Sequence, residues 1–403
     1  MRELEAWGDY DRDNPFSLFH EVLARGAVHP VTLADGHDAY LVMGYDEVKA
    51  ALNDPRLSKD MKAALAMSGD VVAEGLPGPE FARHMLVVDP PDHTRLRRLV
   101  AAAFSVRRIE SLQPRVQQVV DDLLNVIAAE GPDAVVDLVS MFAFPLPFTV
   151  ICELLGVPMS ERAAFGRALS VLLSPSPTQE SSDCVVELLQ ELIDARQRDP
   201  DDALVSALIS ARDGDERLDQ RELQSTIFQL IVAGHDTTAS LIGNGVVALL
   251  RNPEQMARLR ADTSLIPHAI EEILRYDAAV PHATFRYATE SIELGGVTIP
   301  AGAQVIVNLA AANRDPNHYP EPDDLDLDRE DVRHLGFGHG IHFCLGAPLA
   351  RMEGHLAFRS LLTRFPDMRL AVADEELHWG HGDGLVLRGL SALPLVMGTP
   401  ARA

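Results

Sequence analysis

The sequence predicts a mainly α-helical protein with small β-sheets. Three observations support this fold class. Helical periodicity recurs along most of the chain, strand-like alternation is confined to short stretches, and residues 221–251 form one long run that is apolar nearly all round. A helix of that length would span ~45 Å. Because it has no continuous polar face, we expect it to cross the core.

The first part of the chain is predicted to combine a short helix with a β-hairpin. Residues 14–25 fit a helix with Asn14 as its cap and Pro15 at the first helical position. Residues 28–43 alternate around an Ala-Asp-Gly turn at 34–36, which is typical of a hairpin. Weak periodicity at 59–84 indicates an irregular segment. Further helices are expected after the prolines at 90 and 91 and at 46–53, 111–130, 145–156, 160–173, 183–198, 201–212, 254–261 and 268–276.

The last part of the chain is predicted to return to short strands. Residues 280–316 read as strand, Gly-Gly hairpin, Pro-Ala-Gly turn and strand. A proline-rich acidic stretch at 317–335 is expected to be irregular, and the strand-like ends of 368–396 predict a small terminal sheet.

Composition limits the classes of protein that fit. The 403 residues contain no linker, so we expect one large domain spanning 1–403. With 35 basic and 60 acidic residues the net charge is −25, which opposes binding to nucleic acid or to anionic membranes. Three cysteines without framework spacing argue against a disulfide-stapled secreted protein. The first residues carry neither a signal sequence nor a membrane-length segment, and we expect a soluble, cytoplasmic monomer with no membrane anchor.

The segment FGHGIHFCLG at 337–346 is the strongest chemical signal. Glycines surround Cys344 just ahead of a predicted helix, where the helix dipole and free backbone N–H groups would stabilise a thiolate and suit it to ligate a metal. A buried structural cysteine remains an alternative. A zinc site of His339, His342 and Cys344 is another, although the expected second pair of ligands is missing.

Other motifs are unusual in their local contexts. AGHDTT at 233–238 places Gly, Asp and Thr inside the long apolar helix, which weakens it and indicates either a functional site or Thr side chains that bond back to the helix. His93 and Arg97 share one helical face and suit a carboxylate or phosphate, unless that face is merely solvated. Glu272 and Arg275 fit an ordinary surface ion pair.

Together these motifs resemble the soluble bacterial cytochrome P450 enzymes, which are haem-thiolate monooxygenases, over essentially the whole chain. The overall pattern is similar to the actinobacterial branch that acts on macrolides, other secondary metabolites or steroids. The matching motifs are FGHGIHFCLG, Glu272-x-x-Arg275, AGHDTT, DPPDHTRLRR at 89–98 and TFRYA at 284–288. The resemblance implies the cytochrome P450 fold, with haem b between the long core helix and the cysteine-bearing loop, and O2 as co-substrate.

The resemblance also implies roles for the matched residues around the cofactor. Cys344 would be the metal ligand, with Phe337 packing on the sulfur side and Gly338 and Gly346 admitting the porphyrin. The haem propionates would be held by His93, Arg97, Arg286 and His342. Glu272 and Arg275 would form a buried structural pair. Where the family commonly completes this pair with an arginine, the chain has Asp324, so Arg329 or His334 takes over, or the pair is satisfied otherwise.

The distal side of the haem would be lined by the long helix. Thr237 and Asp236 would deliver protons during oxygen activation, and Gly234 would leave room for oxygen. The family's substrate-recognition segments correspond to 61–87, 165–180, 229–237, 279–285 and 383–388. Their candidate substrate contacts are Leu86, Val232, Ala233, Val280, His282, Thr284 and Val386.

The resemblance implies electron delivery from outside, because no flavin-binding stretch is apparent. A ferredoxin and an NAD(P)H-dependent ferredoxin reductase would supply the electrons. We expect an acidic ferredoxin to dock on Arg95, Arg98, Arg107, Arg108 and Arg115. The expected reaction is hydroxylation or epoxidation of a bulky lipophilic macrolide or polyketide, terpenoid or steroid. The alternatives are a non-catalytic haem-binding sensor and an oxidative coupling enzyme.

Overall fold

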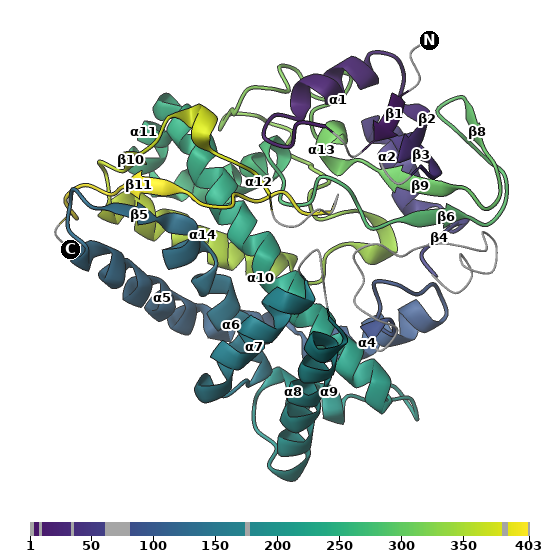
Figure 1. Ribbon diagram of the computed structural model, residues 1–403, viewed down its shortest axis with the longest axis horizontal. Coiled ribbons are helices and arrows are strands. Elements are labelled where there is room, and N and C mark those ends of the chain that lie inside the picture. Colours follow the sequence, from purple (N-terminus) through teal and green to yellow (C-terminus); the bar gives the residue numbers. More distant parts are fainter. Residues whose placement is uncertain are drawn as a thin grey trace.

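The helix α10 (Gln220–Arg251) runs diagonally through the middle of the molecule (Figure 1). It begins with a capping box, because the Asp219 side chain accepts from the Glu222 N–H and the Glu222 side chain accepts from the Asp219 N–H. Most of its side chains are buried, as the absence of a polar face predicts. The computed structural model describes residues 4–7, 10–33, 36–60, 81–173, 178–380 and 386–401.

Other helices pack around α10 and form the bulk of the fold. Its direct neighbours include α6 (Pro145–Leu155), α14 (Ala347–Arg364), α12 (Ile266–Tyr276), α8 (Gln179–Arg198) and the π-helix η2 (Val139–Ala143). The remaining helices are α1 (Phe16–Leu23), α2 (Tyr45–Asn53), α4 (Asp92–Ala103), α5 (Val106–Ala129), α7 (Met159–Leu172), α9 (Leu204–Ser210), α11 (Pro253–Ala261), η3 (Thr263–Leu265), α13 (Leu309–Ala312), η4 (Gly340–His342) and η5 (Asp374–Glu376).

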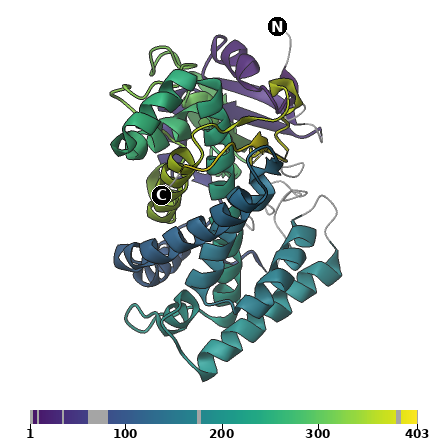
Figure 2. The same cartoon turned by 90° about the vertical axis from the view of Figure 1, so that its left-hand side faces the viewer.

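Three small sheets complete the fold. The largest has the strand order β1-β2-β3-β9-β6-β4 and lies on the opposite side of the molecule from α8, as Figure 2 shows. β10, β11 and β5 form a second sheet, and β7 pairs with β8. The strands are β1 (Leu4–Trp7), β2 (Val28–Leu33), β3 (Asp38–Val42), β4 (Leu57–Ser58), β5 (Val135–Asp137), β6 (Arg286–Ala288), β7 (Ile292–Leu294), β8 (Val297–Ile299), β9 (Gln304–Val307), β10 (Arg369–Leu370) and β11 (Pro394–Val396).

The mainly α-helical fold with small sheets is confirmed, with corrections at some boundaries. The first helix begins at Phe16 with Pro15 at its cap, so Asn14 is not the cap that the sequence predicted. The predicted hairpin forms as β2 and β3, while residues 34–35 of its turn lie outside the described residues. The predicted irregular segment at 59–84 also lies partly outside them, and the helix predicted to begin at 183 begins at Gln179 as α8.

The AGHDTT segment leaves α10 unbroken, although its composition predicts a weak point. The polar side chains here bond to carbonyls one turn earlier and so do not compete for other backbone groups. The Thr237 hydroxyl donates to the Ala233 carbonyl at 2.8 Å, and the Ser240 hydroxyl donates to the Asp236 carbonyl at 2.8 Å. His235 Nδ1 lies 2.6 Å from the Ile231 carbonyl oxygen. The helix therefore stays regular while carrying polar groups in its middle.

Within the described residues, no single helix is both long enough and apolar enough to cross a membrane. The helices 139–155 and 159–172 would pass such a test only as one bent pair, by length and composition.

Candidate active site

The loop before α14 holds Cys344 in a tightly turned backbone. Gly338 and Gly340 adopt φ angles of 71° and 73°, which glycine accommodates without strain. At Gly340 a Cβ atom would lie 2.5 Å from the Asn53 side chain and 2.9 Å from a backbone oxygen, so no larger residue fits. The Cys344 N–H donates to the Phe337 carbonyl at 2.9 Å. These constraints fix the thiol just ahead of the helix.

The electrostatic environment of Cys344 differs from the one predicted. Burial raises the pKa of the thiol, even though the backbone N–H groups of Gly346 and Ala347 point at the sulfur and act to lower it. The helix start therefore favours the thiolate less than burial opposes it. The side chain is nevertheless accessible to solvent. Cys344 thus borders accessible space while protein surrounds it, as a ligand for a bulky group requires.

Basic side chains from distant parts of the chain gather near this loop. The rings of His93 on α4 and His342 on η4 lie 4.3 Å apart between centroids. Both nitrogens of His93 are buried and have no hydrogen-bond partner in the described residues. Arg97 donates to the Phe343 carbonyl at 2.8 Å, which places its guanidinium beside the cysteine loop. Arg286 is 3% exposed, and burial lowers its pKa to about 10.

Lys59 belongs to the same cluster, and the sequence did not single it out. Ser58 pairs with Tyr287 across β4 and β6, so the next position, Lys59, continues opposite Arg286. Lys59 is 7% exposed, and burial lowers its pKa well below the ordinary value. Like charges placed opposite each other across strands are destabilising. Within the described residues neither Lys59 nor Arg286 forms an ion pair. In the sequence, only the position of Lys59 directly after a short strand could have indicated that it faces another strand.

The cluster fits a ligand with carboxylates. Burial, together with the nearby charge of Lys59, lowers the pKa of His342 to about 2. The nearby Asp89 carboxylate already accepts from the Ser58 hydroxyl and from the Lys59 N–H. Buried cations without anions are costly, and His93 retains unused ring nitrogens. The residues present therefore suit the two propionates of haem, with a thiol at the adjacent loop.

The face of α10 that borders accessible space carries Thr237 and Ala233. Ala233 is exposed and Thr237 is partly exposed, whereas Thr238 beside them is buried. Gly234 has a different position from the one predicted. A Cβ atom there would lie 3.0 Å from Ile151 of α6, so this glycine lets two helices pack closely and does not open the Thr237 face.

Asp236 is buried and lies against its neighbour. Its carboxylate oxygen is 3.3 Å from Nε2 of His235, and the two side chains are largely shielded from solvent. The His235 ring stands edge-on to Phe144 and Phe148, with ring centroids 5.3 and 5.6 Å away. The sequence named Asp236 as a candidate but did not single out His235.

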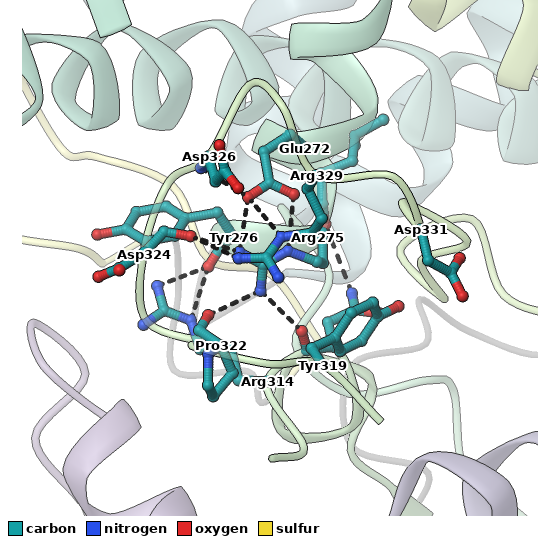
Figure 3. Close-up of polar contacts among 12 residues, drawn as sticks. Glu272, Arg275, Tyr276, Arg314, Tyr319, Pro322, Asp324, Asp326, Arg329 and Asp331 are labelled. Carbon is teal, nitrogen blue, oxygen red and sulfur yellow. Dashed lines mark hydrogen bonds and ion pairs between the residues drawn. The ribbon is translucent and has the colours of Figure 1, made fainter. Parts of the chain in front are cut away.

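Glu272 and Arg275 form a fully buried pair with bonds of 2.7 and 2.8 Å (Figure 3). Arg329 supplies a second cation, because its Nε donates to Glu272 at 3.1 Å. The missing arginine expected at Asp324 is therefore present five positions later in the chain. His334 pairs with Glu271 instead.

The two arginines also bind backbone carbonyls of the segment between them in the chain, as the dashed lines in Figure 3 partly show. Arg275 donates to the carbonyls of Asn313, Pro322 and Asp324. Arg329 donates to the carbonyls of Pro320, Glu321 and Asp324. Asp324 therefore takes part through its carbonyl, while its side chain is exposed.

The candidate substrate contacts divide into two groups. His282 is fully buried, and its ring packs against Trp7, Tyr10 and Phe19, so it is a core residue and the sequence-based assignment is corrected. The others are partly buried or, for Ala233, exposed: Leu86, Val232, Val280, Thr284 and Val386. Residues 61–80, 174–177 and 383–385 of the expected recognition segments lie outside the described part of the chain.

The arginines expected to bind a ferredoxin are largely engaged within the protein. Arg95 pairs with Glu222, Arg98 with Asp213 and Arg115 with Glu153, and Arg108 donates to the Asp202 carbonyl. Of the predicted set, Arg107 is exposed and forms no ion pair within the described residues. This surface is therefore less positive than the sequence predicted.

A surface depression of about 680 Å³ lies beside the cysteine loop. Arg351 lies over the Phe337 ring at 4.7 Å and pairs with Glu271 on its wall. Two apolar residues of the cysteine loop are exposed, Ile341 by 51% and Phe343 by 39%. The zinc alternative finds no support, because in the described ranges no three His, Cys, Asp or Glu side chains converge as metal ligands.

Comparisons with known proteins agree with this geometry. The sequence pattern of the Cytochrome P450 family matches residues 176–366. The 6-deoxyerythronolide B hydroxylase of Saccharopolyspora erythraea is 44% identical over 391 residues, covering 94% of this chain and 95% of the relative. The cytochrome P450 monooxygenase PikC of Streptomyces venezuelae is 43% identical, with 98% and 93% covered. The tirandamycin C-bound P450 monooxygenase TamI superposes with a TM-score of 0.88 at 44% identity, covering 98% of this chain and 100% of that one.

Proposed function

The chain belongs to the cytochrome P450 family of haem-thiolate monooxygenases, and on this premise we propose that it hydroxylates or epoxidises a macrolide or another polyketide. Haem b held through a cysteine thiolate supplies the oxygen-activating chemistry of the family. The relatives named for a macrolactone hydroxylase and for a tirandamycin-bound enzyme support this choice of substrate class.

The observation that carries the cofactor assignment is the basic cluster beside Cys344. Cys344 would ligate the iron, and His93, Arg97, Arg286 and His342 would hold the propionates. Lys59 joins them in this proposal, because its buried charge lacks an ion-pair partner in the described residues. The same anion would relieve the repulsion between Lys59 and Arg286 across the strands.

Two polar residues of α10 would control protons. The Thr237 hydroxyl donates to the Ala233 carbonyl, so its oxygen is fixed in direction and free to accept a further hydrogen bond. Asp236, one residue earlier, is buried and titratable. In an apolar surrounding these two groups would pass protons inward while bulk water is kept away.

The substrate would lie against small and apolar side chains. Ala233 and Val232 on α10, with Val280, Val386 and Leu86 from other segments, are only partly covered or exposed. Such a lining suits a large lipophilic ring more than a charged metabolite. Thr284 would add a polar contact.

We propose that a ferredoxin, itself reduced by an NAD(P)H-dependent reductase, delivers the electrons to a monomeric enzyme. The exposed Ile341 and Phe343 and the depression next to them support docking beside the cysteine loop. The ion pairs of Arg95, Arg98 and Arg115 argue against a contact that depends mainly on unpaired arginines.

Optical spectroscopy tests the proposal directly. The reduced protein treated with carbon monoxide should show the strongly red-shifted Soret band of a haem thiolate, and the Cys344→Ser variant should lose it. A panel of macrolactones, linear polyketides, terpenoids and steroids is then titrated. A shift from low to high spin with macrolactones or polyketides, followed by oxygenated product, supports the proposal. A shift confined to steroids or terpenoids would overturn the substrate class, and haem binding without any turnover would support the sensor alternative.

A further inference from the structure

His235 and Asp236 form a buried pair within α10 that the proposed function does not explain. His235 is 3% exposed and Asp236 is 9% exposed. The His235 ring packs edge-on against Phe144 and Phe148, which stack on each other, and these contacts restrict its rotation. The only described charged partner within ion-pair distance of Asp236 is His235 itself, at 3.3 Å.

The hydrogen bonds of the ring fix one of its protons. Nδ1 lies 2.6 Å from the Ile231 carbonyl oxygen. A carbonyl only accepts hydrogen bonds, so Nδ1 must carry a hydrogen. In a neutral ring Nε2 then has a lone pair and no hydrogen, and it lies 3.3 Å from a carboxylate oxygen of Asp236. Two acceptors would thus oppose each other in a buried place, which is unfavourable unless a proton lies between them.

We propose that His235 and Asp236 share one proton. In this proposal His235 is a positioning residue, which holds the shared proton at Asp236, next to Thr237 in the chain. The proposal rests on the proposed function, in which Asp236 and Thr237 pass protons, and it adds a role for His235. In each transfer one proton would leave the pair toward the Thr237 hydroxyl. A neutral imidazole and a carboxylate would remain, and a proton from solvent would restore the pair.

The other titratable groups around this part of α10 do not supply the proton equally well. Glu353 of α14 lies near Thr238, which is two residues after Asp236 in α10. On α6, Glu153 is held by Arg115 and Arg162. Cys152 of α6 is buried, and burial raises its pKa to about 12. The acids of α12 are bound to arginines and to a histidine, and those of α8 are exposed.

Two substitutions of His235 separate its two contributions. His235→Phe keeps a ring against the stacked Phe144 and Phe148 but has no nitrogen. His235→Gln can still donate an amide hydrogen to Asp236 but carries no titratable proton. Each is combined with Asp236→Asn in a double-mutant cycle. His318→Phe is the matched control, because its ring also stacks on an aromatic residue, Tyr45, at 3.5 Å, in a loop outside the site.

The measurements use the haem-loaded enzyme with a plant-type ferredoxin and its reductase. The substrate is the panel compound that gives the largest spin shift. For each variant we measure haem content, the carbon monoxide spectrum, and the product and peroxide formed per NADPH. We expect both His235 variants to keep the spectrum and to lower product per NADPH on the order of tenfold, with peroxide rising in return. In the Asp236→Asn background neither should lower it further, and His318→Phe should match the parent.

Each other outcome overturns the inference. Wild-type coupling in His235→Gln would mean that orientation alone matters and that no proton is shared. A further loss when His235→Phe is added to Asp236→Asn would mean a packing role. Unchanged coupling in both variants would mean no role. If the parent enzyme itself lacks the haem-thiolate spectrum or forms no product, it is the proposed function that fails, which is seen before any variant is made.

Discussion

Nε of Arg329 donates to the carboxylate of Glu272 at 3.1 Å, joining residues that are 57 positions apart in the chain. Glu272 is fully buried and already bonds to Arg275 through both oxygens. A buried carboxylate with two guanidinium partners is stable only while the geometry holds, because each charge has left water. The loop that carries Arg329 is thereby fixed to α12.

Replacing Arg329 by Met should lower the free energy of unfolding by about 3 kcal/mol, because three carbonyls and one carboxylate oxygen each lose a donor. Chemical unfolding measures the change. Asp324→Ala and Arg333→Gln are controls that should each cost less than about 1 kcal/mol, since both side chains are exposed. An equal loss in Arg329→Met and Arg333→Gln would show that the buried arrangement contributes nothing special.

Glu353 predicts a pH-dependent stability. It is 1% exposed, both carboxyl oxygens lack a hydrogen-bond partner within the described residues, and burial raises its pKa to about 8. The folded state therefore keeps a proton that the unfolded chain releases near its ordinary pKa of 4.5. This contribution is complete below the unfolded pKa and is lost as the pH rises through about 8.

We therefore expect the unfolding free energy to fall between pH 6 and 8.5, with about 1.4 kcal/mol for each unit of pKa difference as an upper scale. Glu353→Gln should flatten this slope, because its amide does not ionise. Glu375→Gln, an exposed acid, should leave the slope unchanged. Parallel slopes in the parent and in Glu353→Gln would rule out the buried acid as the cause.

Thr237→Ala should leave haem content and substrate binding unchanged and should divert electrons to peroxide, because the hydroxyl that would pass protons is gone. The product yield per NADPH should fall on the order of tenfold or more. Thr237→Ser keeps the hydroxyl and is expected to retain most of the yield. If Thr237→Ala makes as much product per electron as the parent, the role proposed for this residue is wrong.

Lys59→Met should reduce the preference of the protein for haem, which has free propionate carboxylates, over haem dimethyl ester, in which they are blocked. Reconstitution with haem and with its dimethyl ester gives a ratio of affinities, and that ratio should shrink several-fold in the variant as a charge-assisted bond is lost. Lys49→Met, an exposed lysine on α2, serves as the control. An unchanged ratio would mean that Lys59 does not meet a carboxylate.

Ile341→Lys should raise the ferredoxin concentration needed for half-maximal turnover about tenfold, because it puts a charge into an apolar docking surface. The substrate-induced spin shift should not change. Met159→Lys alters a residue that is 74% exposed on α7 and should have no effect. Turnover should depend only weakly on salt, since most of the nearby arginines are paired. A steep fall in turnover with salt would restore electrostatic docking as the explanation.

The sequence predicted the helices and the cysteine loop well because periodicity and glycine spacing are local properties. Lys59 was missed because its meaning depends on Arg286 across a strand pair more than 200 residues away in the chain. Gly234 and His282 were misassigned for the same reason: a motif gives the residue but not the face it presents. The sequence left open whether Arg329 or His334 completes the Glu272 pair, because only the folded loop shows which of them reaches Glu272, and it is Arg329.

The hydrogen bonds from Arg275 and Arg329 to the backbone of residues 320–324 affect which sequence changes this loop can tolerate. Arg275 and Arg329 bind carbonyl oxygens, which every amino acid provides, so substitutions in this loop can accumulate without loosening it. Inserting or deleting one residue would move all the carbonyls out of register at once. In a collection of variants the loop should therefore keep its length while its residues change. An alignment of such variants should show no gaps in this loop, even where few of its residues are identical.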